Sequence, residues 1–241
     1  MYFVANRPVS LTEEKAATVC FPAPVTVADI IGGGKFYTFT GVQKNEETNK
    51  WEAVYSEYTE DKLVSNMPYI YVPSSDEKLQ IHENLTLDDT SFEPKAATVG
   101  DWTFQGVYKK TNWNAENANI SGKEYGFAAE NRGTAEIGDF VQIGEGAWQN
   151  AGTAYLKYTG SDDPFKASTR GKENLPERIT VVLKSINGDG QTTAIGSIDT
   201  KTGEISFDDK GDWYTISGNR LSEKPSKTGV YIHNGKKVII K

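Results

Sequence analysis

The residues that could act as acids, bases or nucleophiles are few and widely separated. The chain has two histidines, His82 and His233, and one cysteine, Cys20. Neither histidine has a serine or cysteine nucleophile motif beside it, and the sequence lacks both Gly-x-Ser-x-Gly and His-Glu-x-x-His. We therefore expect no catalytic residue, and we expect His82 to lie on the surface of a strand. A hydrolase is the most distant functional alternative.

The acidic residues do not form a pattern that predicts catalysis or metal binding. Three pairs of adjacent aspartates occur, at Asp88-Asp89, Asp162-Asp163 and Asp208-Asp209. Adjacent residues of a strand point to opposite faces, so such a pair cannot share a proton or a glycosidic bond. The segment Asn187 to Gln191 alternates oxygen ligands like the start of a calcium loop, but the later glycine and glutamate are not at the required positions. We interpret it as a hairpin turn and expect no metal.

The glycine run Gly32-Gly33-Gly34 could suggest a phosphate-binding loop. Such a loop requires Gly-Lys followed by Ser or Thr, whereas Lys35 is followed by Phe36. We interpret the run as a turn, and the sequence predicts no cofactor.

Two tryptophans are the strongest candidates for contact with a ligand. Trp113 is followed by Asn114, and Trp148 is followed by Gln149 and Asn150, in segments that we expect to be turns, where a large ring is hard to bury. Sugar-binding surfaces combine a flat aromatic ring with amide groups that reach hydroxyls. These five residues form a candidate carbohydrate-binding site. The alternative is that each ring folds back and covers the end of the fold.

Composition limits the classes of partner. The net charge of -7 argues against nucleic acid, because neutralising phosphates requires clustered Lys and Arg. No apolar run approaches the length of a transmembrane helix, so we expect no membrane insertion. Cys20 is the single cysteine and lies in the apolar run ATVCFPAPV, which predicts a small buried hydrophobic residue and no internal disulfide.

Alternating apolar and polar residues predict strands along the whole chain, separated by short polar turns. The expected strands cover residues 4–9, 17–27, 35–42, 51–58, 67–72, 79–87, 100–108, 125–129, 136–143, 153–159, 178–186, 193–199, 204–207, 230–233 and 238–240. Pro22 and Pro24 predict that the second of these is an edge strand or bends. No segment has the period of an amphipathic helix over three turns.

These strands predict an all-β chain: an antiparallel β-sandwich, Greek-key or jelly-roll-like, followed by a small C-terminal β-module. We place the sandwich at residues 1–160, a linker at 161–177 and the C-terminal module with its terminal hairpin at 178–241. The linker is assigned because Gly160 to Pro176 is rich in Asp, Ser, Gly and Lys and has few apolar residues.

The last stretch, WYTISGNRLSEKPSKTGVYIHNGKKVIIK, ends in two short strands around Asn234-Gly235, which is a strong hairpin signal. It resembles the ending of many exported surface proteins of the Bacteroidetes (Bacteroides/Prevotella-type), a terminus similar to type IX secretion sorting domains. The resemblance implies a sorting or anchoring region and the secretion machinery as a partner. The matching residues are Trp213, Gly218, Arg220, Gly229, Tyr231, Asn234 and Gly235. Lysines cluster on this hairpin, either as solvated edge-strand charge or as a docking patch.

The front half resembles a β-sandwich module of the same surface proteins, often found after leucine-rich repeats. The matching segments are NRPVSLTEEKAATVCFPAPV, KFYTFTGV and NMPYIYVP, with Ala16-Ala17 in place of the usual Trp-Asn. The resemblance implies a non-catalytic, structural or adhesive module whose partner is a glycan or a host surface protein. It also implies an extracellular or cell-surface location. The N-terminus has no signal-peptide pattern, so we expect a fragment of a longer secreted protein.

Overall fold

The computed structural model describes residues 16–74, 79–81, 93–113, 123–128, 136–160, 175–186, 192–198, 205–209, 213–216, 220–221, 225–233 and 236–240. Within these ranges the chain forms strands and one 3-10 turn, η1 (Val27–Asp29). The strands of the first half are β1 (Ala17–Cys20), β2 (Val25–Thr26), β3 (Ile30–Ile31), β4 (Lys35–Lys44), β5 (Trp51–Glu57), β6 (Lys62–Leu63), β7 (Pro68–Val72), β8 (Gln80–Ile81), β9 (Ala96–Val99), β10 (Trp102–Val107) and β11 (Thr111–Asn112). Those of the second half are β12 (Glu124–Phe127), β13 (Asp139–Gln142), β14 (Trp148–Gln149), β15 (Thr153–Tyr158), β16 (Arg178–Ile186), β17 (Thr192–Ile198), β18 (Ile205–Asp209), β19 (Trp213–Thr215), β20 (Arg220–Leu221), β21 (Gly229–His233) and β22 (Lys236–Ile240).

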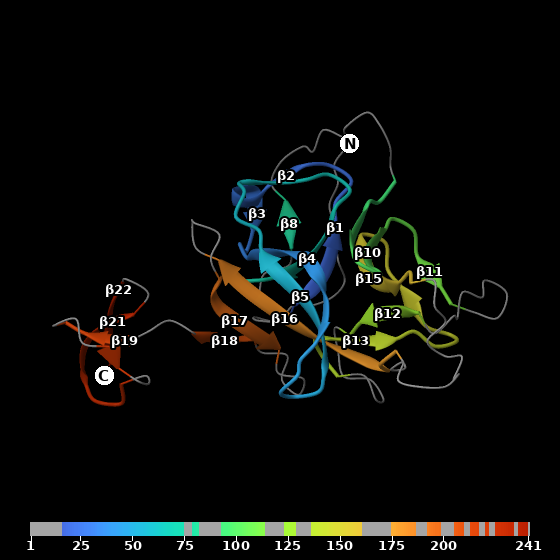
Figure 1. Cartoon of the computed structure of the whole chain (residues 1–241). Helices are drawn as coiled ribbons and strands as arrows, with labels where there is room; N and C mark the ends of the chain where they lie inside the picture. Colours follow the sequence, from blue (N-terminus) through green and yellow to red (C-terminus); the bar gives the residue numbers. More distant parts are fainter. Residues whose placement is uncertain are drawn as a thin grey trace.

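Twelve of these strands form one large sheet, and the all-β prediction is confirmed (Figure 1). Its order is β1-β7-β4-β5-β16-β13-β12-β15-β10-β9, and β17 and β18 extend it from β16. The neighbours are antiparallel except β5 and β16, which run parallel. The sequence predicts a sandwich, which has two packed sheets. In the structure the strands follow one continuous hydrogen-bonded path from β1 to β9.

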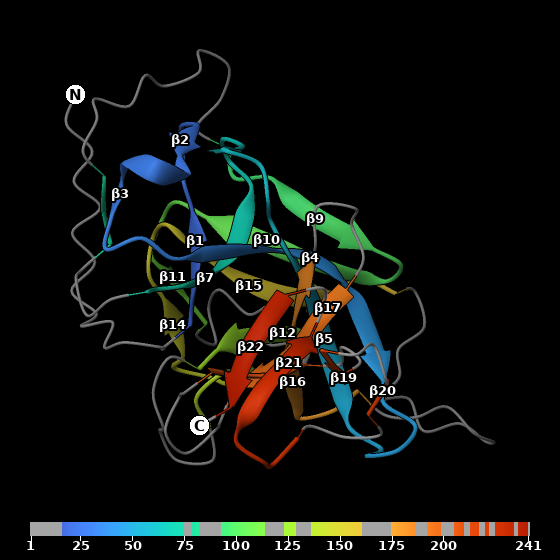
Figure 2. The same cartoon turned by 90° about the vertical axis from the view of Figure 1, so that its left-hand side faces the viewer.

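The large sheet curls until its first strand meets strands near its other end. The Cys20 amide of β1 donates to the Gly152 carbonyl at 2.9 Å, and the Ala154 amide of β15 donates to Thr18 Oγ1 at 3.1 Å. The last strand, β9, lies beside β4 (Figure 2). Strand β1 is thus at the end of the hydrogen-bonded path, as Pro22 and Pro24 predict, and its outer side is covered by the curl.

Aromatic side chains fill the inside of the curl. Tyr55, Phe104 and Phe140 are completely buried, and the rings of Tyr55 and Phe104 meet edge to face with centroids 5.3 Å apart. A second cluster, on the other face of β7 and β4, contains Tyr69, Tyr71 and Phe36. Because successive side chains of a strand alternate, Ile70 joins the first cluster while its two tyrosine neighbours join the second. Burial on both faces explains why this strand is apolar at every position.

The C-terminal module is smaller than the sequence predicts. Strand β16 lies between β5 and β13, and β17 and β18 follow it, so these three strands belong to the large sheet. The physical reason is that Ile179, Val181 and Leu183 are completely buried and Val182 nearly so, which requires cover on both faces. Leu175, at the end of the predicted linker, also packs on this core; residues 161–174 lie outside the described part of the chain.

The last four strands of the chain, β19 to β22 (red in Figure 1), form a sheet of their own in the order β20-β19-β21-β22. The predicted terminal hairpin is present, because His233 of β21 pairs with Lys236 of β22 and the two flank positions 234 and 235. The predicted strand at 4–9 lies wholly outside the described residues, and residues 82–87 of the predicted strand at 79–87 lie outside them as well. Strands β3, β6, β9, β11, β14 and β20 are absent from the predicted strands, because each of them is short or lies in polar sequence.

Candidate functional site

The candidate sugar-binding residues lie on and beside a two-stranded ribbon formed by β11 and β14. Asn112 is paired with Trp148, and Thr111 is paired with Gln149. Directly paired residues of an antiparallel ribbon project from the same face. Asn112 and Trp148 therefore share one face, and both are exposed, Trp148 to 51%.

Lys110 completes this face. Its ammonium nitrogen lies over the Trp148 ring, 4.8 Å from the ring centroid, and the side chain is exposed. A cation over an exposed tryptophan contributes about 0.5–1 kcal/mol. We call Lys110, Asn112 and Trp148 the Trp148 face. It combines a flat apolar ring, an amide and a positive charge.

Trp113 lies on the opposite side of the ribbon and is buried. Only 5% of it is exposed, and its ring meets Tyr155 edge to face at 5.7 Å. The expectation that this ring is hard to bury is wrong, because the residue after Asn112 faces inward on the ribbon, and a role in ligand binding stays a prediction. The backbone of Trp113 also fixes the turn before β14. The Trp113 amide donates to the Ala147 carbonyl at 2.9 Å, and the Gly146 amide donates to the Trp113 carbonyl at 2.7 Å.

The two amide residues after Trp148 support the ribbon from within. Gln149 Nε2 donates to Thr153 Oγ1 at 2.8 Å, and that hydroxyl donates to the Asn150 carbonyl at 2.6 Å. Since Thr153 is buried, this chain of hydrogen bonds fixes the turn between β14 and β15. Gln149 thus faces away from the exposed Trp148 ring, and its ligand role stays a prediction. Asn114 lies outside the described residues.

The ribbon is a continuation of the β10–β15 pair of the large sheet. Val107 and Thr153 form the last pair of that ladder, and the Gly152 amide donates to the Val107 carbonyl at 2.7 Å. The carbonyl of Gly152 in turn accepts a hydrogen bond from the Cys20 amide of β1. The Trp148 face therefore adjoins the place where β1 is hydrogen-bonded to the turn before β15. Sequence reasoning missed Asn112 and Lys110, although their alternation with Trp113 in KKTNW would place them outward on a strand.

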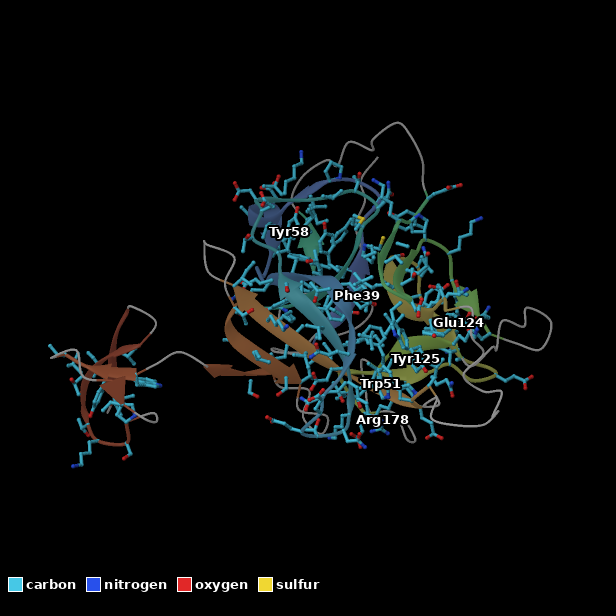
Figure 3. The ribbon with its side chains drawn as sticks, in the orientation of Figure 1. Phe39, Trp51, Tyr58, Glu124, Tyr125 and Arg178 are labelled. Carbon is cyan, nitrogen blue, oxygen red and sulfur yellow. The ribbon has the colours of Figure 1, made fainter. Side chains whose placement is uncertain are left out.

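A second polar cluster joins β13 and β16 near the Arg178 side chain labelled in Figure 3. Arg178 Nε lies 3.6 Å from Asp139 Oδ2, and Arg178 Nη1 lies 2.9 Å from Glu136 Oε2. Asp139 is 2% exposed, and its Oδ1 has no hydrogen-bond partner in the described structure. Burial raises the pKa of Asp139 to about 6, although Arg178 and Thr180 lower it. The neighbouring β12 buries Glu124, whose Oε1 is 3.5 Å from Lys157 Nζ.

These carboxylates are held by ion pairs and do not form a metal site. Among the described residues, no group of three or more His, Cys, Asp or Glu side chains is arranged to bind a metal ion. The same part of the chain contains no helix with the length and apolar character needed to cross a membrane.

The residues predicted for sorting are only partly described. Trp213 is buried and its ring lies 6.5 Å from that of Tyr231, edge to face. An added Cβ at Gly229 would lie 3.1 to 3.3 Å from the Tyr231 ring, so glycine leaves room for this contact. Arg220 pairs with Tyr214 in the β19–β20 ladder. Gly218, Asn234 and Gly235 lie outside the described residues.

Charge divides the chain unevenly. Residues 213–241 contain six Lys and Arg and one Glu, a net charge of +5, so the remaining residues carry -12. The terminal segment is thus the basic part of an acidic protein.

Comparisons of the chain with protein-family models, with curated proteins and with solved structures found no match.

Proposed function

We propose that this chain is a non-catalytic adhesive module of an exported bacterial cell-surface protein, and that it binds a carbohydrate on the Trp148 face. The observation that carries the proposal is the exposure of Trp148 on a ribbon whose other tryptophan, Trp113, is buried. Its location would be extracellular or at the cell surface, and its partner a free glycan or a glycan on a host surface protein.

The arrangement around Trp148 suits a sugar. A single exposed apolar side chain is common on protein surfaces and needs no explanation by itself. Here, however, the backbone that carries the ring is fixed by hydrogen bonds at both ends of the ribbon, so little backbone entropy is lost when a ligand stacks on the ring. Asn112 supplies both a donor and an acceptor on the same face, which is what vicinal hydroxyls require.

The glycan proposal is tested with a glycan array and a mucin-binding assay on the purified chain, followed by titration of each glycan that binds. Trp148→Ala should weaken binding at least about tenfold, as expected when an exposed aromatic hot spot is removed. Val64→Ala is the matched control, because Val64 is 46% exposed and lies far along the chain, between β6 and β7. Unchanged binding by Trp148→Ala, or no binding of any glycan, would contradict the proposal.

For the terminal segment we propose a role in secretion or anchoring, with the export machinery as its partner. The supports are the resemblance of Trp213 to Lys241 to sorting domains, the separate pairing of β19–β22 and the charge of +5. In the full-length protein, carrying an export signal, truncation after Gly211 should keep the product inside the cell or periplasm while the large sheet stays folded. Normal amounts of truncated protein at the surface would contradict this role.

A further inference from the structure

We propose that the Trp148 face selects an acidic sugar, one that bears a carboxylate, and that Lys110 recognises the charge. This inference rests on the proposed carbohydrate-binding function and adds the chemical class of the ligand.

The position of Lys110 is the first argument. Its ammonium lies over the Trp148 ring at 4.8 Å from the centroid, where a stacking sugar would otherwise lie. A neutral sugar that uses this side of the ring must displace the ammonium and gives it no charged partner in return. A sugar carboxylate accepts a charge-assisted hydrogen bond from the displaced ammonium, and such bonds are roughly twice as strong as neutral ones. The same lysine therefore penalises neutral sugars and favours acidic ones.

The charge around the ring is the second argument. Lys109 and Lys110 are adjacent and exposed, and neither ammonium forms an ion pair with a described residue. The exposed Glu145, in the turn before β14, is the one acidic residue within 109–113 and 144–150. The ribbon is thus locally positive in a body of charge -12. At physiological ionic strength charges beyond about 8 Å are largely screened, so the ammonium over the ring acts on a stacked sugar more strongly than any charge beyond that distance.

The experiment measures binding of matched sugar pairs by the full chain at 0.15 M salt. One pair is a glucuronate-containing oligosaccharide and its carboxyl-reduced form; the other is sialyllactose and lactose. For the wild-type chain we expect at least one acidic member to bind about fivefold or more tightly than its neutral counterpart. Lys110→Gln should bring that ratio close to one without weakening the neutral sugar. Lys109→Gln, the matched control, should retain most of the preference.

Trp148→Ala separates this inference from the function on which it rests. If neutral sugars bind as well as acidic ones, or if Lys110→Gln keeps the preference, the acidic-sugar assignment is overturned. Provided that Trp148→Ala weakens binding at least about tenfold, the carbohydrate-binding function stands in either case. Binding of sulfated glycans with no binding of carboxylated ones also overturns the assignment. No binding of any sugar overturns both proposals. Equal thermal unfolding midpoints of the variants show that each one folds.

Discussion

Replacing Asp139 with asparagine should stabilise the protein at pH 8 and leave its stability almost unchanged near pH 4. Asp139 is the first residue of β13 and pairs with Thr180 of β16, so it lies at the junction of these two strands of the large sheet. Its side chain is almost completely buried, and Oδ1 has no hydrogen-bond partner in the described structure. Burying a charged group without full hydrogen bonding is costly. Asparagine has nearly the same shape and no charge.

The size of the effect follows from the pKa. Burial raises the pKa of Asp139 from 3.8 to about 6; Arg178, Thr180 and Lys50 act in the opposite direction, and Glu136 adds to the rise. Each pKa unit corresponds to about 1.4 kcal/mol, so ionised Asp139 costs the folded state up to about 3 kcal/mol. The pKa of Asp139 is higher in the folded state than in the unfolded state. Protonated Asp139 therefore contributes fully to the stability of the folded state below pH 4, and this contribution is lost as the pH rises through 6. The variant should therefore gain up to about 3 kcal/mol at pH 8.

The measurement is urea unfolding of the wild-type chain and of Asp139→Asn at pH 4 and pH 8. Asp61→Asn is the matched control, because Asp61 is exposed, and its stability change should be small at both values. A variant that is less stable than the wild type at pH 8 would refute the reasoning. It would show that attraction to Arg178 outweighs the cost of burying the charge.

Two further predictions concern other buried polar groups. Cys20 should react slowly with thiol reagents at pH 8 in the native state, because burial raises its pKa to about 11 and thiolate is the reactive form; fast labelling without denaturant would show that β1 is accessible. Tyr55→Phe should be neutral or stabilising by about 1 kcal/mol in thermal or urea unfolding, because the buried Tyr55 hydroxyl has no partner among the described residues. Tyr125→Phe should instead cost about 1 kcal/mol, because Tyr125 donates to the Pro176 carbonyl at 2.8 Å; equal effects of the two changes would contradict this.

The sequence predicts the strands of the large sheet better than their arrangement. The expected strand at 178–186 has the bounds of β16, because its apolar residues are dense and bounded by polar ones. Its place between β5 and β13 depends on pairing with a strand more than 120 residues earlier, which no local pattern specifies. One signal was available: Ile179, Val181, Val182 and Leu183 nearly fill the strand with apolar residues, which is typical of a central strand covered on both faces. A strand of a small terminal module would alternate.

The sequence predicts that the candidate site contains tryptophan and amide side chains, but it does not predict which of these residues share the exposed face. Trp113 and Trp148 have similar neighbours, since both are next to Asn or Gln. The register of β11 with β14 separates them, and a shift of one residue would exchange the faces of a strand. That register is set by contacts beyond the ribbon, above all by Trp113 against Tyr155 and by the hydrogen bonds at Gly152.

The pairing of β11 with β14 determines which of the two tryptophans is buried and which is exposed. Trp113 follows the residue that pairs with Trp148, so the two rings lie on opposite faces of one ribbon. One face of the ribbon packs on the large sheet, and the Trp113 ring occupies it. As long as this pairing is kept, the chain cannot bury both rings against that sheet. Trp148 stays 51% exposed, and the Lys110 ammonium lies over its ring, 4.8 Å from the centroid. A ligand that stacks on the Trp148 ring would cover the apolar surface that this pairing leaves in water.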